Sequence, residues 1–515
     1  MAKSLARNSV ISGFAAIATN LAGFLSTVIV ARLVGIDGTG VVSFSAAIAT
    51  IAIALFDLGI QTTLARFVPE VEATGGESQV RALVWHLLRI FIAGNLVLFL
   101  GLLGIGVYCY VIDPGKLSWI TADNFRDNPL FWGITAAFCL VQALAFFETA
   151  YLKGRQHFRE LTVISIISMI VQLCAVLVAT WLYGIVGALL GTFFGPAYLA
   201  ARALRHRPGE TRPVQVLRQR LMRFGSLTLA AQILSTLMTT RLEILFLEWS
   251  WGTTAVGLFT VSLTLANMAC VPMFLCTALL PHLSSLVGED ALEQTRETYR
   301  YSLRLLALIV LPGCLGLAAI TPVLLPSIYG PAFRDAVPSA MLLITFSACI
   351  TLSTVPMTFL LAREQGRLVI TVSAIGAALT ILSGLTLIPL FGTIGGAVGR
   401  ALMHAVVFAI ALHLLVARLG CRPPIGDLVR ILLAAITCGT VALAVVWWWQ
   451  SWAGIILAIV VGLMIYGVAL RLFGALKGPD ADRIRRSLSL LPGLLQHPSE
   501  ILLGHLSVST ETKRG

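Results

Sequence analysis

The stretch Tyr183-Gly-Ile-Val-Gly-Ala-Leu-Leu-Gly191 recurs as Phe391-Gly-Thr-Ile-Gly-Gly-Ala-Val-Gly399, with three glycines in the same register. The offset is 208 residues, from 183 to 391, and it also carries Arg155 onto Arg363. Glycines alone are weak evidence of a repeat, because small residues are common wherever membrane helices pack closely. A register that holds across a basic loop as well indicates an internal duplication.

The composition around this repeat is that of an integral membrane protein. Of 515 residues, 58% are hydrophobic and 12% are charged, and the mean hydropathy is +0.91, whereas soluble domains are about 25% charged. The net charge of +12 is spread between apolar segments and forms no single patch, which argues against nucleic acid as a partner. The nine cysteines lie mostly inside apolar runs without a CxxC motif, so we expect neither a disulfide framework nor a metal site.

Fourteen apolar stretches are long enough to cross a bilayer, which takes about 20 residues. They cover roughly residues 8–34, 39–64, 81–112, 129–152, 160–182, 184–204, 222–247, 254–286, 300–328, 338–362, 367–390, 392–418, 425–449 and 452–473. The first stretch is too long for the apolar core of a signal peptide, so we interpret it as a retained helix. The sequence therefore predicts an all-α integral membrane protein of about fourteen transmembrane helices.

The repeat divides these helices into two lobes. Gly40-Val-Val-Ser-Phe resembles Gly257-Leu-Phe-Thr-Val at an offset of 217 residues, from 40 to 257, so helices 1–6 correspond to helices 7–12. Because six is an even number, both copies enter the membrane in the same orientation, as a parallel repeat. The predicted domains are an N-lobe (1–204), a linker (205–221), a C-lobe (222–418), two further helices (419–473) and a basic tail (474–515).

Lysine and arginine predict the orientation, because they concentrate in cytoplasmic loops. With both termini in the cytoplasm, most basic residues fall on that side, and Arg32, Lys116, Arg126 and Arg334 fall outside. Nearly all tryptophans then lie at the outer ends of the helices, as interfacial anchors do. The tail contains a basic amphipathic stretch at 482–491 that either lies on the membrane surface or is solvated.

The motifs of common enzyme classes are absent from the sequence. There is no G-x-x-x-x-G-K-[ST] loop for ATP and no H-E-x-x-H zinc motif. The longest predicted outer loop, residues 113–128, is too short to hold a catalytic domain. We therefore predict a transporter rather than an enzyme, and we expect no cofactor.

Five short motifs together carry a resemblance to a known family. They are Asn8-Ser-Val-Ile, Ala31-Arg-Leu-Val-Gly, Phe56-Asp-Leu-Gly-Ile, Leu152-Lys-Gly-Arg-Gln and Gly184-x-x-Gly-Ala. The chain also shares the predicted number of fourteen helices and the twofold repeat with the polysaccharide flippases. Over roughly residues 5–475 it therefore resembles that family. These form a branch of the multidrug/oligosaccharidyl-lipid/polysaccharide exporter superfamily.

The resemblance implies a substrate and partners. Members of this branch move an oligosaccharide on a polyprenyl pyrophosphate from the cytoplasmic to the outer leaflet of a bacterial inner membrane. The product serves cell-surface polysaccharides such as lipopolysaccharide, O-antigen or exopolysaccharide. Implied partners are the lipid-linked oligosaccharide, the bilayer and, beyond them, a glycan polymerase and glycosyltransferases.

Charged residues at membrane depth are rare and generally face a cavity or a partner, so they are our candidates for the substrate site. In the N-lobe they are Asp57, about 13 Å deep at 1.5 Å per residue, Gln61 one turn later, and the similarly deep Arg89. In the C-lobe they are Arg241, Arg400 and, one turn beyond Arg400, His404.

Arginine suits a pyrophosphate because its planar fork binds two oxygens and stays protonated. We expect Arg400 to face the central cavity and contact the pyrophosphate, with His404 in support. The 208-residue offset places the uncharged Thr192 opposite Arg400. The repeat thus supplies the glycine scaffold, while the charges differ between the lobes. The alternative is that these side chains form structural ion pairs between helices or extend to the membrane surface.

Two carboxylates receive a structural interpretation. Glu148 precedes Lys153 by five residues, and we expect the two to pair locally. Glu243 is placed near the outer interface, and since it lies two residues from Arg241 it points to nearly the opposite side of a helix. Neither is expected to take part in binding.

Two other functions stay open at this point. A cation-coupled multidrug exporter of the same superfamily would favour acidic sites for organic cations. A membrane glycan polymerase or ligase is the more distant alternative, since such enzymes usually need a larger outer loop than this chain offers.

Overall fold

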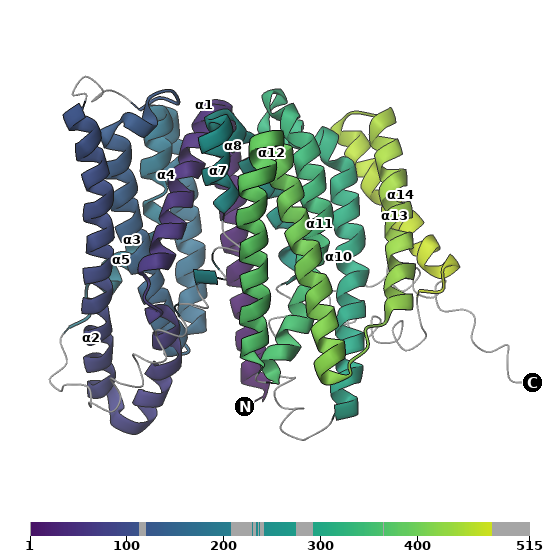
Figure 1. The fold of residues 1–515 in the computed structure, drawn as a ribbon, viewed down its shortest axis with the longest axis horizontal. Coiled ribbons are helices and arrows are strands. Elements are labelled where there is room, and N and C mark those ends of the chain that lie inside the picture. The colour runs from purple at the N-terminus through teal and green to yellow at the C-terminus, as the bar shows by residue number, and fades with distance from the viewer. Residues whose placement is uncertain are drawn as a thin grey trace, which may run out of the picture.

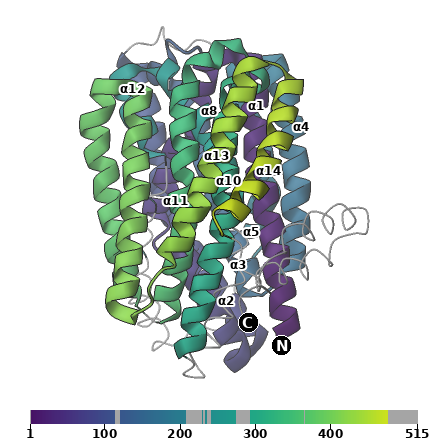
Figure 2. The ribbon, with the colours of Figure 1, turned by 90° about the vertical axis from the view of Figure 1, so that its right-hand side faces the viewer.

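The structure, a computed structural model, is all-helical over the residues that it describes: 2–112, 120–207, 229, 233–234, 236, 241–273, 292–363 and 365–475. The first half contains α1 (Ala2–Phe56), α2 (Ile60–Ile112), η2 (Phe125–Asp127), α3 (Pro129–Gly154), α4 (Phe158–Gly191) and α5 (Phe194–Ala203). The second half contains α7 (Leu242–Trp251), α8 (Thr253–Ala269), α10 (Leu292–Tyr329), η4 (Pro331–Ala336), α11 (Val337–Ala362), α12 (Gly366–Leu419), α13 (Ile425–Trp448) and α14 (Trp452–Leu472). Figures 1 and 2 show that the long helices pack side by side, roughly parallel to one another, in one bundle.

The predicted membrane spans are present as helices. Ten stretches within the described residues are long and apolar enough to cross a membrane. Three of them, 17–56, 158–203 and 366–418, contain a non-helical glycine at which two of the predicted spans meet. The helix predicted at 222–247 is described mainly from residue 241 onward, as α7. These ten stretches correspond to thirteen of the predicted spans, and they confirm the all-α membrane fold.

The backbone repeats where the sequence repeats. Gly184 and Gly392, which are 208 residues apart, have φ/ψ of 57°/−129° and 55°/−129°. Gly35 and Gly252, which are 217 residues apart, have φ/ψ of 73°/−165° and 77°/−172°. Positive φ is costly for any residue with a Cβ, which explains why glycine stands at all four turns. The four turns lie close together, since an added Cβ would place Gly38 beside Ile185, Gly40 beside Thr253 and Gly392 beside Trp251. The end of the bundle that carries them is called the turn end below; α7 and α8 lie toward this end, and the N-terminus lies at the other (Figure 1).

The glycines that follow each turn bring two antiparallel helices into backbone contact. A methyl group added at Gly187 would lie 1.8 Å from the carbonyl oxygen of Ala179, and one added at Gly395 would lie 2.1 Å from that of Leu387. Both partners lie eight residues upstream and across the turn, at equivalent positions of the two copies. The repeated glycine motif is therefore the contact surface of two equivalent helical hairpins.

One predicted helix boundary is wrong. The second span was expected to run unbroken from 39 to 64, but α1 ends at Phe56 and α2 begins at Ile60. Leu58 and Gly59 between them have φ of 53° and 69°, and the backbone oxygen of Asp57 accepts from the amide of Ile60 at 3.0 Å. The helix then continues past 64 to a turn at Gly76, because a helix that leaves the bilayer no longer needs apolar side chains.

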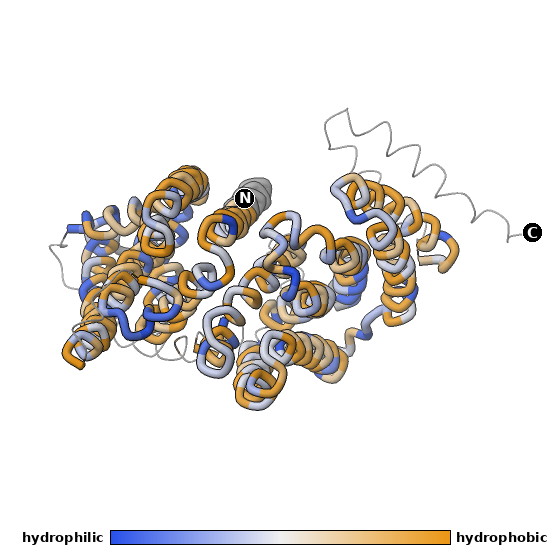
Figure 3. Tube along the Cα trace, turned by 90° about the horizontal axis from the view of Figure 1, so that it is seen from above, coloured by the Kyte–Doolittle hydropathy of each residue, from blue (hydrophilic) through white to orange (hydrophobic). Residues whose placement is uncertain are grey.

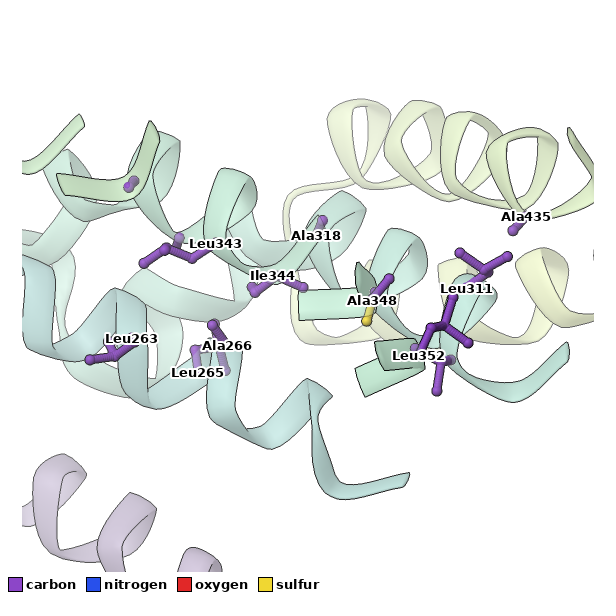
Figure 4. Close-up of a cluster of buried hydrophobic side chains, with 14 of the residues drawn as sticks. Leu263, Leu265, Ala266, Leu311, Ala318, Leu343, Ile344, Ala348, Leu352 and Ala435 are labelled. Atoms are coloured by element: carbon purple, nitrogen blue, oxygen red, sulfur yellow. The ribbon is translucent and has the colours of Figure 1, made fainter. Parts of the chain in front are cut away.

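The largest hydrophobic core lies in the second half of the chain. Figure 4 shows part of it, where Leu263 and Ala266 of α8, Leu311 of α10 and Leu343 of α11 gather. The pair α13 and α14 packs on α10, with the hydroxyl of Tyr466 donating to the carbonyl of Leu308 at 2.9 Å. The two final helices thus lie beside α10, away from the first lobe, as Figure 3 shows from above.

The domain boundaries at 204, 221, 418 and 473 remain predictions. Most of the linker 205–221, the amphipathic stretch 482–491 and the rest of the tail lie outside the described residues.

Candidate functional site

A buried ion pair between α7 and α12 forms the centre of the candidate site. The Nε atom of Arg400 donates to Oε1 of Glu243 at 2.9 Å, and its NH2 atom donates to Oε2 at 3.3 Å. The two residues are only 6% and 1% exposed. This fork-to-fork geometry uses both carboxylate oxygens, as expected for an arginine held in a low-dielectric interior.

The glycine motif before Arg400 explains how its helix comes so close to its neighbours. A Cβ on Gly396 would lie 3.1 Å from the ring of Phe259 on α8, and one on Gly399 would lie 2.5 Å from the hydroxyl of Ser383. Since no side chain separates the helices there, the guanidinium of Arg400 can reach across to α7. The same motif that builds the hairpin therefore also positions the charge.

Arg241 stands directly before α7 and outside its helical backbone, with φ −73° and ψ 46°. It is half-buried and lies within electrostatic reach of Arg400 and Tyr329. Within the described part of the chain, Arg241 has neither a hydrogen bond nor an ion pair. The guanidinium of Arg241 therefore adds a positive charge beside the neutral pair of Arg400 and Glu243.

The cluster borders a cavity of about 320 Å³ that is lined by both halves of the chain. Its polar lining consists of Asn20 from α1, Asn267, Cys270, Ser347, Arg400 and His404. The imidazole of His404 bonds to the backbone of Phe346, and its Nδ1 atom is buried with no partner in the described ranges. Arg400 and His404 thus line one cavity together with an amide from the other lobe, while their contact with a substrate stays a prediction.

The N-lobe candidates lie elsewhere. Asp57 is buried at the break between α1 and α2, where Gln61 and the amides of Gly59 and Gln61 bond its carboxylate. Its Oδ1 atom has no partner among the described residues. Arg89 is exposed on α2. The structure therefore brings together Arg241, Arg400 and His404, and it groups Asp57 with Gln61 at a separate position.

Sequence reasoning gave Glu243 no role, although it is the partner of Arg400. A carboxylate in an otherwise apolar helix is as unusual as the arginine, so pairing the rare charges of opposite sign would have found it. The expected pair of Glu148 with Lys153 is also wrong. Glu148 forms an ion pair with Arg202, whose Nε lies 2.8 Å from Oε1, and its Oε2 lies 2.7 Å from Nε2 of His206, because these residues approach from the neighbouring helix.

At the turn end the two lobes contact each other through equivalent residues, which are related by a local twofold axis. A Cβ on Gly40 would lie 2.2 Å from the carbonyl of Thr253, and a Cβ on Gly257 would lie 2.1 Å from the carbonyl of Ile36. The hydroxyl of Thr254 donates to Asp37 at 2.6 Å. Residues 36, 37 and 40 correspond to 253, 254 and 257 at the 217-residue offset, so equivalent surfaces meet here.

Two further polar contacts join the lobes at the turn end. Nε of Arg126 donates to Glu248 at 2.8 Å, and Nε of Arg32 donates to the carbonyl of Ile328 at 2.7 Å. Arg32 thereby caps carbonyl groups at the end of α10. The cavity beside Arg400 is thus separated from the turn end by packed backbone and by these contacts.

Comparisons with known proteins give a family match and several similar folds. A family model described as polysaccharide biosynthesis protein matches residues 5–287, and no curated protein sequence matches significantly. The fold is similar to the lipid II flippase MurJ in an inward closed conformation (TM-score 0.67, 14% identity, covering 90% of this chain and 98% of that one).

Two other solved structures share the fold. One is an inward-facing multidrug resistance MATE family transporter of the MOP superfamily (TM-score 0.63, 13% identity, 78% and 94% covered). The other is a MOP superfamily transporter from Pyrococcus furiosus (TM-score 0.57, 12% identity, 81% and 96% covered). At these identities the likeness establishes the fold.

Proposed function

The chain belongs to the polysaccharide biosynthesis protein family, and from that premise we propose that it flips a polyprenyl-pyrophosphate-linked oligosaccharide across a membrane. The protein is a multi-pass membrane protein with the fold of the MOP superfamily transporters. In the proposed role it works in a bacterial inner membrane with both termini in the cytoplasm, and it acts as a transporter without an enzymatic step.

The observation that carries this proposal is the charge balance of the cluster beside the cavity. Glu243 neutralises Arg400, and Arg241 lies within electrostatic reach of Arg400 without an ion pair among the described residues, so a net positive charge remains beside the cavity. A pyrophosphate is the complementary ligand, since a guanidinium binds phosphate oxygens in pairs. An exporter of organic cations would instead call for an excess of carboxylates in this cavity.

In this proposal the ion pair forms when the site is empty and is broken when the substrate is bound. Without substrate, Glu243 neutralises Arg400 and keeps a buried guanidinium from standing alone, which would be costly. An incoming pyrophosphate carries more negative charge than the carboxylate and competes for the same fork. Arg241, which has no such partner in the described ranges, is available to the first phosphate that arrives.

Movement of the lobes would then carry the head group across. The contacts at the turn end, including Asp37 with Thr254, hold that end shut. In the predicted orientation this end faces outward, so the described state is closed to the outside. Opening requires these contacts to break, and the two lobes to rock about the shared surface while the lipid tail stays in the bilayer.

Transport assays with purified protein test the proposal. Proteoliposomes would carry a fluorescent polyprenyl-pyrophosphate sugar, and its movement between leaflets would be followed by quenching. Arg241→Gln removes a cation that has no described partner, so the fold should persist while the rate falls about tenfold, the cost of one charge-assisted contact. Arg334→Gln, an exposed arginine in η4, is the matched control and should transport normally.

A variant that removes both charges of the ion pair distinguishes an effect on substrate binding from an effect on folding. The double variant Glu243→Gln/Arg400→Gln removes both charges and should stay folded but lose transport. If this double variant and Arg241→Gln both flip the lipid at the wild-type rate, the cluster is structural and the site assignment is wrong. If the vesicles move organic cations and leave the pyrophosphate lipid in place, the exporter is the correct function.

A further inference from the structure

A groove on the first lobe is a second cavity, and the proposed function makes no use of it. It has a volume of about 1000 Å³ and runs along α4 and the start of α5, beginning at the end opposite the turn end. Its mouth is polar and includes Gln156, His157, Arg159 and Glu160. Its walls are apolar and include Val163, Ile167, Val171, Phe194 and Tyr198.

The mouth of the groove carries one positive charge, that of Arg159, which no described carboxylate neutralises. Glu160 is held by Arg202 and by Nδ1 of His157, the latter at 3.1 Å, so its negative charge is already compensated. Arg159 is exposed and makes no ion pair or hydrogen bond with any residue that the structure describes. An anionic group at the mouth would therefore meet an uncommitted guanidinium.

The apolar wall continues from this cation to a depth that suits one leaflet. From Arg159 to Val171 there are twelve residues, which span about 18 Å along a helix. Half of a hydrocarbon core is about 15 Å thick. Val163, Ile167 and Val171 recur at a spacing of four, so they line one face, and they are 50%, 55% and 43% exposed. The groove thus offers a charged head position and an apolar track as long as one acyl chain.

The second lobe differs at two of the positions that correspond to the groove. The 208-residue offset carries Arg159 onto Arg367, which is also exposed. It carries Val171 onto Leu379, which packs against a buried cluster, and it carries Glu160 onto Leu368, which packs against the main core. Since the duplicated scaffold does not require an open track, the groove in the first lobe needs another explanation.

We propose that this groove binds an anionic phospholipid of the leaflet at that end, with its phosphate on Arg159 and one acyl chain along Val163, Ile167 and Val171. Membrane-facing arginines attract anionic head groups, and the predicted orientation places the mouth at the cytoplasmic leaflet, where anionic lipids carry the surface charge. The site is separate from the cavity beside Arg400, so its test does not depend on the substrate.

Native mass spectrometry of the full-length protein with added phosphatidylglycerol or phosphatidylcholine tests the charge. The wild type should retain phosphatidylglycerol in preference. Arg159→Gln should weaken phosphatidylglycerol retention about fivefold and leave phosphatidylcholine unchanged. Arg367→Gln, the same change at the equivalent position of the second lobe, should retain both lipids as the wild type does.

A second pair of variants tests the groove. Ile167→Trp fills the track and should reduce retention of both lipids, whereas Ile375→Trp, at the equivalent exposed position of α12, should not. Val163→Phe repeats the test at another point, and gel filtration checks that each variant stays monodisperse. The proposal is overturned if Arg159→Gln retains phosphatidylglycerol like the wild type, if Arg367→Gln loses as much, or if the filled groove retains lipid unchanged.

Discussion

The two lobes share their backbone turns but differ in the charges that those turns position. Gly184 and Gly392 have nearly the same torsion angles, as do Gly35 and Gly252. At these turns a positive φ would strain any residue with a Cβ, and the glycines that follow, such as Gly187 and Gly395, leave no room for a Cβ beside a neighbouring main chain. A duplicated chain can keep its fold only by keeping these positions, so they recur in both copies.

The charged positions are free of that constraint. Arg400 corresponds to Thr192, whose hydroxyl donates to the carbonyl of Leu189 in its own chain segment. Glu243 corresponds to Ser26 at the 217-residue offset, and the hydroxyl of Ser26 is buried with no partner among the described residues. The comparison teaches that the scaffold tolerates two small polar residues, which do not bond to each other, at the positions where the second lobe has an ion pair. The fold of a lobe therefore does not require the ion pair, and we infer that the pair serves the function of the second lobe.

The largest effect is expected from breaking the ion pair on one side. Arg400→Met leaves the carboxylate of Glu243 buried without a partner, which should cost about 3–5 kcal/mol of stability. Thermal unfolding of the purified protein in detergent measures the loss. The double variant Glu243→Leu/Arg400→Met should recover most of it, since a hydrophobic pair of similar volume replaces buried charges well. Failure of the double variant to recover would mean that the fold itself needs these charges.

The hairpin glycines should show equal effects in the two lobes. Gly187→Leu and Gly395→Leu each force a side chain into a main-chain carbonyl, so each should destabilise the protein by about 1–3 kcal/mol through overpacking. Fluorescence-detected gel filtration would show less monodisperse protein for both. Gly426→Leu in α13 is the control, because no atom lies within 4 Å of its added Cβ. A loss confined to one lobe would contradict the structural equivalence of the hairpins.

The contacts between the lobes should set how often the turn end opens. Arg126→Ala and Asp37→Ala each remove a polar contact, and each should favour opening by about 1 kcal/mol. Spin labels at Asp123→Cys and Arg334→Cys in a cysteine-free protein report the distance across this end. We expect a larger population of long distances in both variants. An unchanged distribution would show that main-chain packing at Gly40 and Gly257 alone holds the end shut.

The smallest effect is expected at the position that matches Arg400. Thr192→Val removes a hydroxyl that bonds only within its own segment, so stability should change by no more than about 0.5 kcal/mol. Thermal unfolding and the flipping assay should both resemble the wild type. A large loss of transport would show that the first lobe also reads the substrate at this site, and the contrast between the lobes would fail.

The sequence by itself determined the membrane fold and the duplication. Long apolar stretches must become helices in a bilayer, since every backbone group there needs an internal partner. The glycine register from Gly184 to Gly392 predicted equivalent turns because positive φ and backbone contact both exclude other residues. The sequence also identified Arg400 and His404 as neighbours, since one turn of a helix separates them.

Only the tertiary structure decided which charges meet. Glu243 and Arg400 are 157 residues apart, and Glu148 and Arg202 lie on α3 and α5 with α4 between them in the sequence, so no local spacing pairs them. The break at Asp57 was likewise hidden, because Leu58 adopts a positive φ that its residue type does not predict. Helical periodicity fixes which side chains share a face of one helix. The partner across the interface depends on how the helices cross, and only the packing of the whole bundle sets that.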